Sequence, residues 1–467
     1  MKSERLLIVA YHFPPQSGSS GLLRSLKFSR HLLDFGWQSF VLTVNPRAYE
    51  RLDERQLGEV LPEVRVIRAF ALDTQRHLAW RGRYLRCLTL PDRWASWCLG
   101  AIPVALREIR RHRISVIFTT FPIATAVLIG WVLHRLTGKP WVVDFRDSMT
   151  EEGYPRDRLT WRVWRWIERQ AIEHASLFIF TAPAARQMYL NRYPRLEPQR
   201  CLVIPNGYDE PDFQHLMRSQ PTAVPESRPL RLVHSGLVYP EERDPRAFFS
   251  ALSQLKSAGS ISAATLQIDL RAPGSESYHS QLLKDFDIED LVRLLPPLPY
   301  SQSLQDDAAA DGLLLLQAAW CNHQIPAKAY EYLRVGRPIL ALTPQEGDTA
   351  GLLQEVGGGT IIDLSNVEAI VQRLPGSLEC VRQGQHPLPD PEKVQRYDRR
   401  KQAQQLAASL EGLLPQRPKV QVQDVYPASK PEVTPTGRIG SKKRSSKGCT
   451  ASTDGSISIP LDDGGLD

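Results

Sequence analysis

Short runs of apolar residues alternate along the chain with longer segments in which apolar residues recur at helical spacing. The run LLIVAY at 6–11 is continuous, as expected of a strand buried on both faces of a parallel sheet. A loop containing Pro and Gly follows at 12–21, then a predicted helix at 22–36 that ends at Gly36, and a predicted strand at 39–44. This order predicts a parallel sheet with helices on its faces.

The alternation continues and is interrupted once, by a loose segment at 216–229. Before it, strands are predicted at 64–69, 114–119, 141–145, 176–181 and 201–204, and helices at 98–112, 123–137, 160–174 and 183–192. After it, strands are predicted at 230–236, 265–271, 291–294, 312–316 and 338–342, and helices at 245–256, 277–286, 301–309 and 326–334. The sequence therefore predicts an α/β protein of two doubly wound, Rossmann-like domains, at 1–215 and 230–390, joined by a linker at 216–229.

The C-terminal part of the chain has a different pattern. Residues 391–414 predict a closing helix. From residue 415 onward the chain has too few apolar residues to offset the entropy of ordering, which predicts a disordered tail at 415–467. Whether this tail tethers or regulates the protein, or is a dispensable extension, is open at this point.

One uncharged segment, at 114–133, is long enough to span a bilayer. The Thr-Thr-Phe-Pro sequence in its middle favours a buried strand, a turn and a buried helix instead. The apolar run after Arg5 is too short for a signal peptide, and the six cysteines lack the spacing of a zinc site or a disulfide framework. We therefore expect a cytoplasmic protein, and peripheral contact with the inner face of a membrane stays open.

The formal net charge of +7 is unevenly distributed. Residues 1–215 hold 31 Lys and Arg against 21 Asp and Glu, and the remaining residues hold 27 against 30. A basic N-terminal half indicates an anionic partner, such as a membrane surface, a phosphorylated acceptor or a nucleic acid, or else a solvated Arg-rich surface. No nucleic-acid-binding module is recognisable, so we expect no nucleic acid as a partner.

Two motifs follow predicted strands of the first domain. The loop PPQSGSSG at 14–21 leads into a helix, where free backbone N–H groups favour anions. It does not match GxGxxG and no acidic residue ends the strand at Val44, which disfavours binding of a dinucleotide of the dehydrogenase type. The sequence DFRD places Asp144, Arg146 and Asp147 at a strand end, where they could bind a polyol or act as acid and base, or form a salt-bridged corner.

Three further motifs come later. In IPNGYD (204–209), Asn206-Gly207 predicts a turn with a positive φ at the domain boundary. In HSGLVYPEERDP (234–245), Gly236 ends a strand and Arg243 precedes a helix start, an arrangement that suits a diphosphate. In IPAKAYEYLRVGRPILAL (325–342), Lys328 and Glu331 share a face of a predicted helix; they could grip a nucleotide, or form a surface ion pair.

Taken in order, these motifs resemble those of family 4 glycosyltransferases, which are retaining enzymes of GT-B fold. The resemblance covers roughly residues 5–412 and is carried by PPQSG, RD, NGYD, GLVYPEERDP and PAKAYEYLRVGRP. It implies a central cleft between the two domains, a nucleotide sugar bound by the C-terminal domain, and a role in polysaccharide assembly. His323 and Leu237 depart from the family, which commonly has Glu and Arg there.

The resemblance also implies roles for single residues. Catalysis would depend on Arg243, Lys328 and Asp147. Donor binding would involve Glu331 at the ribose hydroxyls, Lys328 and Arg243 at the diphosphate, and Gly236, Gly18 and Tyr330. The acceptor side would hold Asp144, Arg146, Asp147 and Asn206.

We therefore expect a hexosyltransferase that stabilises a departing nucleoside diphosphate with fixed cations and loop amides. No DxD motif occurs in the segments that form the cleft, so neither a metal nor a cofactor is expected. Arg-rich aromatic segments, WRGRYLR (80–86), PDRWASW (91–97) and WRVWRW (161–166), suit a lipid interface and an isoprenoid-diphosphate-linked acceptor, or place their Trp residues in helix cores. A catalytically weak binding protein and a nucleotide-sugar epimerase of the same fold remain alternatives.

Overall fold

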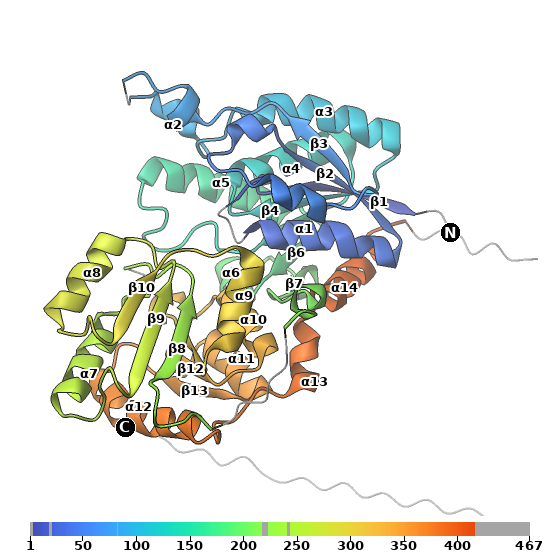
Figure 1. Ribbon diagram of the computed structural model, residues 1–467. Helices are drawn as coiled ribbons and strands as arrows, with labels where there is room; N and C mark the ends of the chain where they lie inside the picture. Colours follow the sequence, from blue (N-terminus) through green and yellow to red (C-terminus); the bar gives the residue numbers. More distant parts are fainter. Residues whose placement is uncertain (1–2, 18–20, 82, 217–222, 241–242, 416–467) are drawn as a thin grey trace, which may run out of the picture. The chain divides into compact units, whose positions relative to one another are not determined.

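The computed structural model of the chain describes residues 3–17, 21–81, 83–216, 223–240 and 243–415. The described residues up to Pro415 form one compact unit that contains two parallel β-sheets (Figure 1). The predicted tail lies outside the described residues from 416 onward, as do Gly18 and part of the predicted linker.

The N-terminal sheet has the strand order β3-β2-β1-β4-β5-β6-β7, and all of its pairings are parallel. Its strands are β1 (Glu4–Val9), β2 (Trp37–Val44), β3 (Arg65–Ala69), β4 (Val116–Phe121), β5 (Trp141–Phe145), β6 (Leu177–Phe180) and β7 (Cys201–Val203). The helices between them are α1 (Gly21–His31), α2 (Thr74–His77), α3 (Trp97–His112), α4 (Ala124–Thr137), α5 (Arg158–His174) and α6 (Pro183–Arg192).

The C-terminal sheet has the order β10-β9-β8-β11-β12-β13 and is also parallel throughout. Its strands are β8 (Leu230–Ser235), β9 (Leu266–Arg271), β10 (Val292–Leu295), β11 (Gly312–Leu316), β12 (Ile339–Leu342) and β13 (Gly359–Ile362). The helices are α7 (Arg246–Ser257), α8 (Glu276–Asp285), α9 (Tyr300–Ala309), α10 (Ala327–Val335), α11 (Asp348–Val356) and α12 (Val367–Arg382).

The predicted pair of Rossmann-like domains is therefore confirmed, and most predicted elements agree with the observed ones to within two residues. The helix predicted at 22–36 is α1 followed by a 3₁₀ turn, and Gly36 ends it in the left-handed conformation. The uncharged segment at 114–133 divides into β4 and α4, both buried, as predicted. Among the described residues, no helix is long and apolar enough to cross a membrane.

The apolar side chains of β1 are buried on both faces of the N-terminal sheet. Leu7 and Val9 of β1 pack into one hydrophobic cluster with residues of α3 and α4. Leu6 and Ile8 point to the opposite face and pack with residues of α1. Alternate side chains of one strand are thus buried against different layers, which is what a continuous apolar run requires.

The last part of the chain returns from the C-terminal domain to the N-terminal one. The predicted closing helix consists of α13 (Pro391–Val394), a 3₁₀ turn at Gln395–Tyr397 and α14 (Arg399–Glu411). Apolar residues of α14, among them Ala403, Leu406 and Leu410, share a buried cluster with Leu22 and Leu26 of α1. In Figure 1, α14 accordingly lies beside α1, although nearly 370 residues separate the two in sequence.

Candidate functional site

A cavity of about 340 Å³ lies where residues of both domains meet. The N-terminal domain contributes residues of α1 and of the segments that follow β5 and β7, and the C-terminal domain contributes residues from the starts of α9 and α10. Its lining residues are Leu22, Leu23, Gln56, Arg146, Asp147, Asn206, Tyr300, Ala327, Lys328, Glu331 and Arg399. Polar groups at the carboxyl ends of parallel strands thus converge on one place, as in other open α/β sheets that bind ligands.

Lys328 and Glu331 form the C-terminal wall of this cavity. Pro326 precedes the first turn of α10, which places the two residues one turn apart; their charged atoms, Nζ and Oε2, are 2.8 Å apart. Tyr300 donates a hydrogen bond of 2.9 Å from its hydroxyl to Oε1 of Glu331. Glu331 is only 5% exposed and the side chain of Lys328 is 26% exposed, so this pair is a part-buried arrangement and not a fully solvated surface ion pair.

A second carboxylate, Asp307 of α9, lies beneath this pair. Its Oδ2 is 3.8 Å from Nζ of Lys328, and its Oδ1 accepts a 2.5 Å hydrogen bond from Oγ of Ser235. Burial raises the pKa of Asp307 to about 6, although the charge of Lys328 opposes this. Burial alone would lower the pKa of Lys328, but the carboxylates of Glu331 and Asp307 outweigh it and raise that pKa, so Lys328 is a permanent cation.

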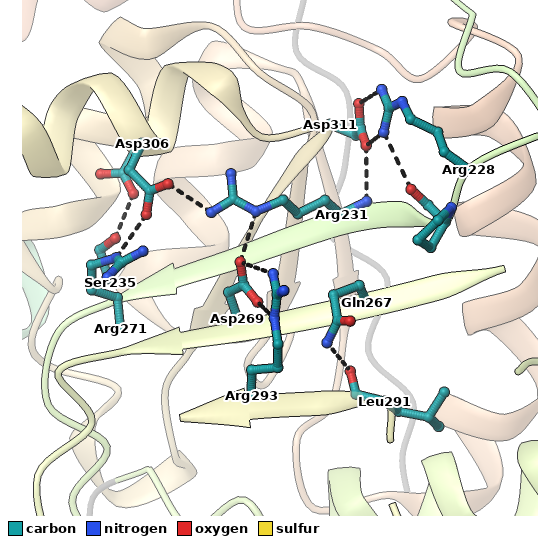
Figure 2. A network of polar contacts seen from close by, with 12 residues as sticks. Arg228, Arg231, Ser235, Gln267, Asp269, Arg271, Leu291, Arg293, Asp306 and Asp311 are labelled. Atoms are coloured by element: carbon teal, nitrogen blue, oxygen red, sulfur yellow. Dashed lines mark hydrogen bonds and ion pairs between the residues drawn. The ribbon is translucent and has the colours of Figure 1, made fainter. Parts of the chain in front are cut away.

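A network of ion pairs fixes α9 and hence Asp307. Arg231 of β8 donates to Oδ2 of Asp269 on β9 at 2.7 Å and to Oδ1 of Asp306 on α9 at 2.6 Å. Arg271, at the end of β9, donates to the other oxygen of Asp306 at 2.7 Å. Figure 2 shows these side chains lying across the strands of the C-terminal sheet. Asp306 thus ties α9 to two strands, while its neighbour Asp307 contacts Lys328 and Ser235.

On the N-terminal side, Arg146 and Asp147 line the cavity. The Nε atom of Arg146 donates to the carbonyl oxygen of Phe121 at 2.7 Å. Its guanidinium lies over Gly21, the first residue of α1, where a Cβ atom would be only 2.3 Å from Nη1. A cation at a helix N-terminus is electrostatically unfavourable on its own, and the two together favour an anion. Burial raises the pKa of Asp147, and the charge of Arg146 opposes that shift.

Asp144, expected on the acceptor side, does not line the cavity. It is buried and accepts two hydrogen bonds from Arg24 of α1, at 3.0 and 2.9 Å. Arg24 also donates to the carbonyl oxygens of Ile204 and Pro205. Asp144 therefore holds α1 against the segment after β7, and of the three polar residues in DFRD only Arg146 and Asp147 face the cavity.

The prediction of a positive φ in the Asn206-Gly207 turn is wrong. Gly207 is not in the left-handed region, and its role is to allow close approach of the returning chain. A Cβ atom there would be 2.1 Å from the carbonyl oxygen of Tyr397 and 2.5 Å from Nε2 of Gln402. Asn206 lines the cavity, as expected. Asp209 at the end of the motif is buried and binds Lys27 at 2.8 Å.

Other residues predicted to bind the donor are not brought to the cavity wall. Arg243 donates from Nη1 to the carbonyl oxygen of Leu237 at 2.6 Å and lies over the ring of Tyr239. Gly236 follows β8 directly and has a φ of 134°, which favours glycine. Tyr330 is fully buried on another face of α10, where its ring packs against Tyr397. Gly18 lies outside the described residues.

Three polar cavity residues escaped the sequence analysis, Tyr300, Arg399 and Gln56, as did the apolar Leu22, Leu23 and Ala327. Tyr300 follows the Pro-rich stretch PPLP and is the first residue of α9. A polar side chain at a helix start after a strand could have indicated a residue of the cavity wall. Arg399 comes from the returning segment, and no local pattern places it beside α1 and α10. Among the described residues, no group of three or more His, Cys, Asp or Glu is arranged to hold a metal ion.

Polar contacts link the two domains around the cavity. His323, one of the two departures from the family pattern, has its Nε2 atom 2.9 Å from Oε1 of Glu151 in the N-terminal domain. Burial raises the pKa of Glu151, but His323 outweighs it and holds that pKa below its usual value. Asp348 at the start of α11 accepts a 2.8 Å hydrogen bond from the backbone N–H of Ala184. The residue that replaces the expected glutamate thus makes a contact between domains.

Comparison with known proteins agrees with this geometry. Residues 23–207 match the model of the glycosyl transferase 4-like domain. No curated protein sequence matches the chain.

Three solved structures illustrate the likeness in fold. A sucrose-phosphate synthase from Thermosynechococcus elongatus has a TM-score of 0.61 at 15% identity, over 88% of this chain and 99% of the other. HepE from Anabaena, in complex with UDP, has a TM-score of 0.58 at 15% identity, over 88% and 100%. WaaG, a glycosyltransferase involved in lipopolysaccharide biosynthesis, has a TM-score of 0.57 at 14% identity, over 87% and 100%. The chain therefore matches a glycosyl transferase 4-like domain at 23–207 and has a two-domain GT-B fold, which it shares with these three structures.

Proposed function

We propose that the protein transfers a sugar from a nucleotide-sugar donor to a glycan acceptor, with retention of configuration and without a metal. The observation that carries this proposal is the Lys328–Glu331–Tyr300 cluster around the buried Glu331, which lines one cavity together with Arg146 of the other domain. A carboxylate for hydroxyl groups and fixed cations for phosphates are what a nucleoside diphosphate requires.

The donor would be held mainly by α10. Glu331 has two carboxylate oxygens to accept hydrogen bonds from ribose hydroxyls, and Tyr300 orients one of them. Lys328 carries the charge that phosphate oxygens need. HepE, which shares the fold, has been crystallised with UDP and with UDP-glucose, and this supports a UDP sugar as the first donor to test.

The proposed reaction breaks the bond between the anomeric carbon and a phosphate oxygen, and the electron pair leaves with the diphosphate. Lys328 and Arg146 would stabilise the charge that grows on that leaving group. The acceptor hydroxyl forms the new glycosidic bond and releases its proton, for which Asp147 in the cavity wall is a candidate base. Retention of configuration is inferred from the family resemblance alone.

The acceptor would approach from the N-terminal domain. A second cavity of about 340 Å³ lies after β1 and β2, and Tyr11, His12, Gln16, Arg51 and Trp94 are among its lining residues. Tyr11 and Trp94 lie with their ring centroids 4.4 Å apart, a surface suited to a sugar ring. Burial and the charge of Arg146 lower the pKa of His12 to about 3, so the His12 imidazole is neutral.

We further propose a lipid-linked acceptor and peripheral contact with a membrane. Trp80 is 77% exposed, and the Arg86 side chain of the same segment pairs with Asp157 at the start of α5. The exposed residues Tyr154, Leu159 and Trp161 are thereby joined to the 80–88 segment in one Arg-rich aromatic surface. Exposed aromatic residues among arginines favour an anionic lipid interface.

Thermal shift measurements with UDP, GDP, ADP and their sugar conjugates would test the donor site. We expect one nucleotide to stabilise the protein by about 2.7 kcal/mol at 100 times its dissociation constant. Glu331→Ala should remove that shift, while the exposed Glu346→Ala, outside the cavity, should retain it. A folded wild-type protein that responds to no nucleotide would contradict the proposal.

Product analysis separates the remaining alternatives. A glycosyltransferase forms a glycoside only when an acceptor is present, whereas an epimerase releases a free epimer of the donor sugar or its nucleotide. Nucleotide binding that depends on Glu331 without any turnover would identify a nucleotide-sugar-binding protein. Retention would be established from the anomeric configuration of the glycoside.

A further inference from the structure

Arg399 is a buried cation in the wall of the cavity. Its residue is only 5% exposed, and it lines the cavity together with Lys328 and Arg146. Its backbone N–H donates to the carbonyl oxygen of Tyr208 at 2.9 Å. Within the described ranges, its guanidinium has neither a hydrogen-bond acceptor nor an ion-pair partner. A charged side chain this buried is rarely left unpaired, because removal from water is costly.

The other charges of the cavity are matched in pairs. Lys328 contacts Glu331, and Arg146 lies close to Asp147, whose charges interact. Arg399 is therefore the excess charge, and the cavity lining carries a net charge of +1. Arg24 lies near Arg399, and the positive end of α14 adds to the same potential, whereas the charges of Glu331 and Asp209 oppose it. The charge in excess, together with the hydrogen-bond acceptor that Arg399 lacks among the described residues, favours an anion at this place.

The position of Arg399 is fixed by the NGYD segment. Tyr208 pairs with Asp398, and Gly207 leaves room for the carbonyl oxygen of Tyr397. Asp398 caps α14 by accepting a hydrogen bond from the backbone N–H of Arg400. The guanidinium is thus delivered to the cavity by a segment anchored at the domain boundary, and such preorganisation favours a bound ligand over a mobile surface charge.

We propose that Arg399 binds the diphosphate of the donor and supplies the second cation that the sequence pattern assigned to Arg243. This inference rests on the proposed function, because it assumes a nucleoside diphosphate in the cavity. Arg243 is turned to the carbonyl oxygen of Leu237 and does not line the cavity. Arg399 lines it, and its planar guanidinium can donate two parallel hydrogen bonds to phosphate oxygens.

Calorimetric titration of the full chain with UDP, uridine and pyrophosphate would test this assignment. Arg399→Met should weaken the binding of UDP and of pyrophosphate at least about tenfold, because charge-assisted hydrogen bonds are lost. The affinity for uridine, which has no phosphate, should stay unchanged. Arg399→Lys, which keeps the charge but not the fork, should have an intermediate effect. Arg400→Gln is the matched control, since Arg400 is its exposed neighbour and pairs with Asp34.

A second readout excludes a merely structural role. If Arg399 serves to bind an anion, its unpaired charge destabilises the ligand-free protein. Arg399→Met should then raise the melting temperature of the ligand-free protein while it weakens UDP binding. A lower melting temperature with unchanged affinity for UDP would overturn the inference and leave the donor site intact. Wild-type protein that binds pyrophosphate but not UDP would overturn the nucleotide donor instead, and binding of neither would overturn both.

Discussion

At the scale of single residues, the adjacent acids of α9 have opposite environments. Asp306 accepts hydrogen bonds from Arg231 and Arg271; burial raises its pKa, but these arginines outweigh it and lower the pKa overall. Asp307 is buried beside Lys328, and burial raises its pKa to about 6. One acid thus anchors the helix as an anion, and the other is a proton-binding group beside the Lys328–Glu331 pair.

We expect Asp307 to make stability depend on pH in a defined interval. Its pKa in the folded state, about 6, lies above the ordinary value of 3.8, so the folded protein binds more protons between these values. The free energy of unfolding should therefore fall as pH rises through that interval, by at most about 3 kcal/mol. Urea denaturation of the wild type and Asp307→Asn at pH 4, 5, 6 and 7 would show the variant gaining relative stability with pH.

Asp306→Asn is the matched control for this measurement. Because the pKa of Asp306 is lowered, its stabilising effect is present above the ordinary pKa and is lost as pH falls. The difference between the wild type and Asp306→Asn should therefore grow with pH, opposite in sign to that of Asp307→Asn. If the free energies of unfolding of the wild type and Asp307→Asn changed in parallel with pH, the assignment of Asp307 as a proton-binding group would be contradicted.

At the scale of elements, the NGYD segment contacts both α1, near the N-terminus, and the segment that leads into α14, near the end of the described chain. Gly207 contacts the returning chain at Tyr397 and Gln402. Gln402 donates a 3.0 Å hydrogen bond from Nε2 to the carbonyl oxygen of Asn206, a cavity residue. The segment therefore couples the docking of α14 to the shape of the cavity.

Gly207→Ala should weaken this junction. The added Cβ would lie 2.1 Å from a backbone oxygen that cannot rotate away, so the returning segment must shift. We expect a loss of roughly 2–4 kcal/mol in the free energy of unfolding, measured by chemical denaturation, with weaker binding of UDP.

Gly376→Ala provides the comparison for that change. Gly376 lies in α12 and has nothing within 4 Å of the position its Cβ would occupy. Alanine there should stabilise the protein by about 0.5–1 kcal/mol, because alanine favours the helix. A Gly207→Ala protein as stable as the wild type would refute the close contact as the reason for this glycine.

Local sequence patterns predicted the helices and strands wherever the apolar residues followed a clear strand or helix pattern. The apolar runs of β1, β4 and β5 and the helical spacing in α1 and α10 placed both halves of the cavity, including Lys328, Glu331 and Arg146. The predictions stopped at 343–390, where β13 is only partly buried and α12 contains Pro375, so that neither period is clear. Arg399 could not be found in this way, because its position depends on α14 packing against α1, which is a contact between distant segments.

At the scale of the whole molecule, the described part has a cavity between the two domains and a separate Arg-rich aromatic surface. The surface comprises residues 80–81 and 83–88, Tyr154, Pro155 and the first turns of α5, and it belongs to the basic N-terminal half. Arg156, Arg158 and Arg162 surround Trp161 there. A lipid-linked acceptor would be reached most directly if this surface lay on the membrane, because the cavity lined by Tyr11 and Trp94, which we propose for the acceptor, belongs to the same domain.

We expect the full chain to sediment with vesicles that contain anionic phospholipid and not with neutral vesicles. Trp80→Ala should weaken binding roughly tenfold, since an exposed Trp would bury apolar area in the interface. Trp320→Ala, an equally large change at an exposed Trp of the C-terminal domain, should have no effect. Binding should also fall as salt rises from low to physiological concentration, because the arginines act through screened charges.

The combination of these results decides what the surface does. Loss of binding in Trp80→Ala with undiminished UDP affinity would show that membrane contact and donor binding are separate functions of the chain. Binding that is strong on neutral vesicles would indicate apolar insertion without a role for the arginines. Equal binding by the wild type, Trp80→Ala and Arg158→Gln would contradict this surface as the membrane contact, and a water-soluble glycan would then be the better acceptor to test.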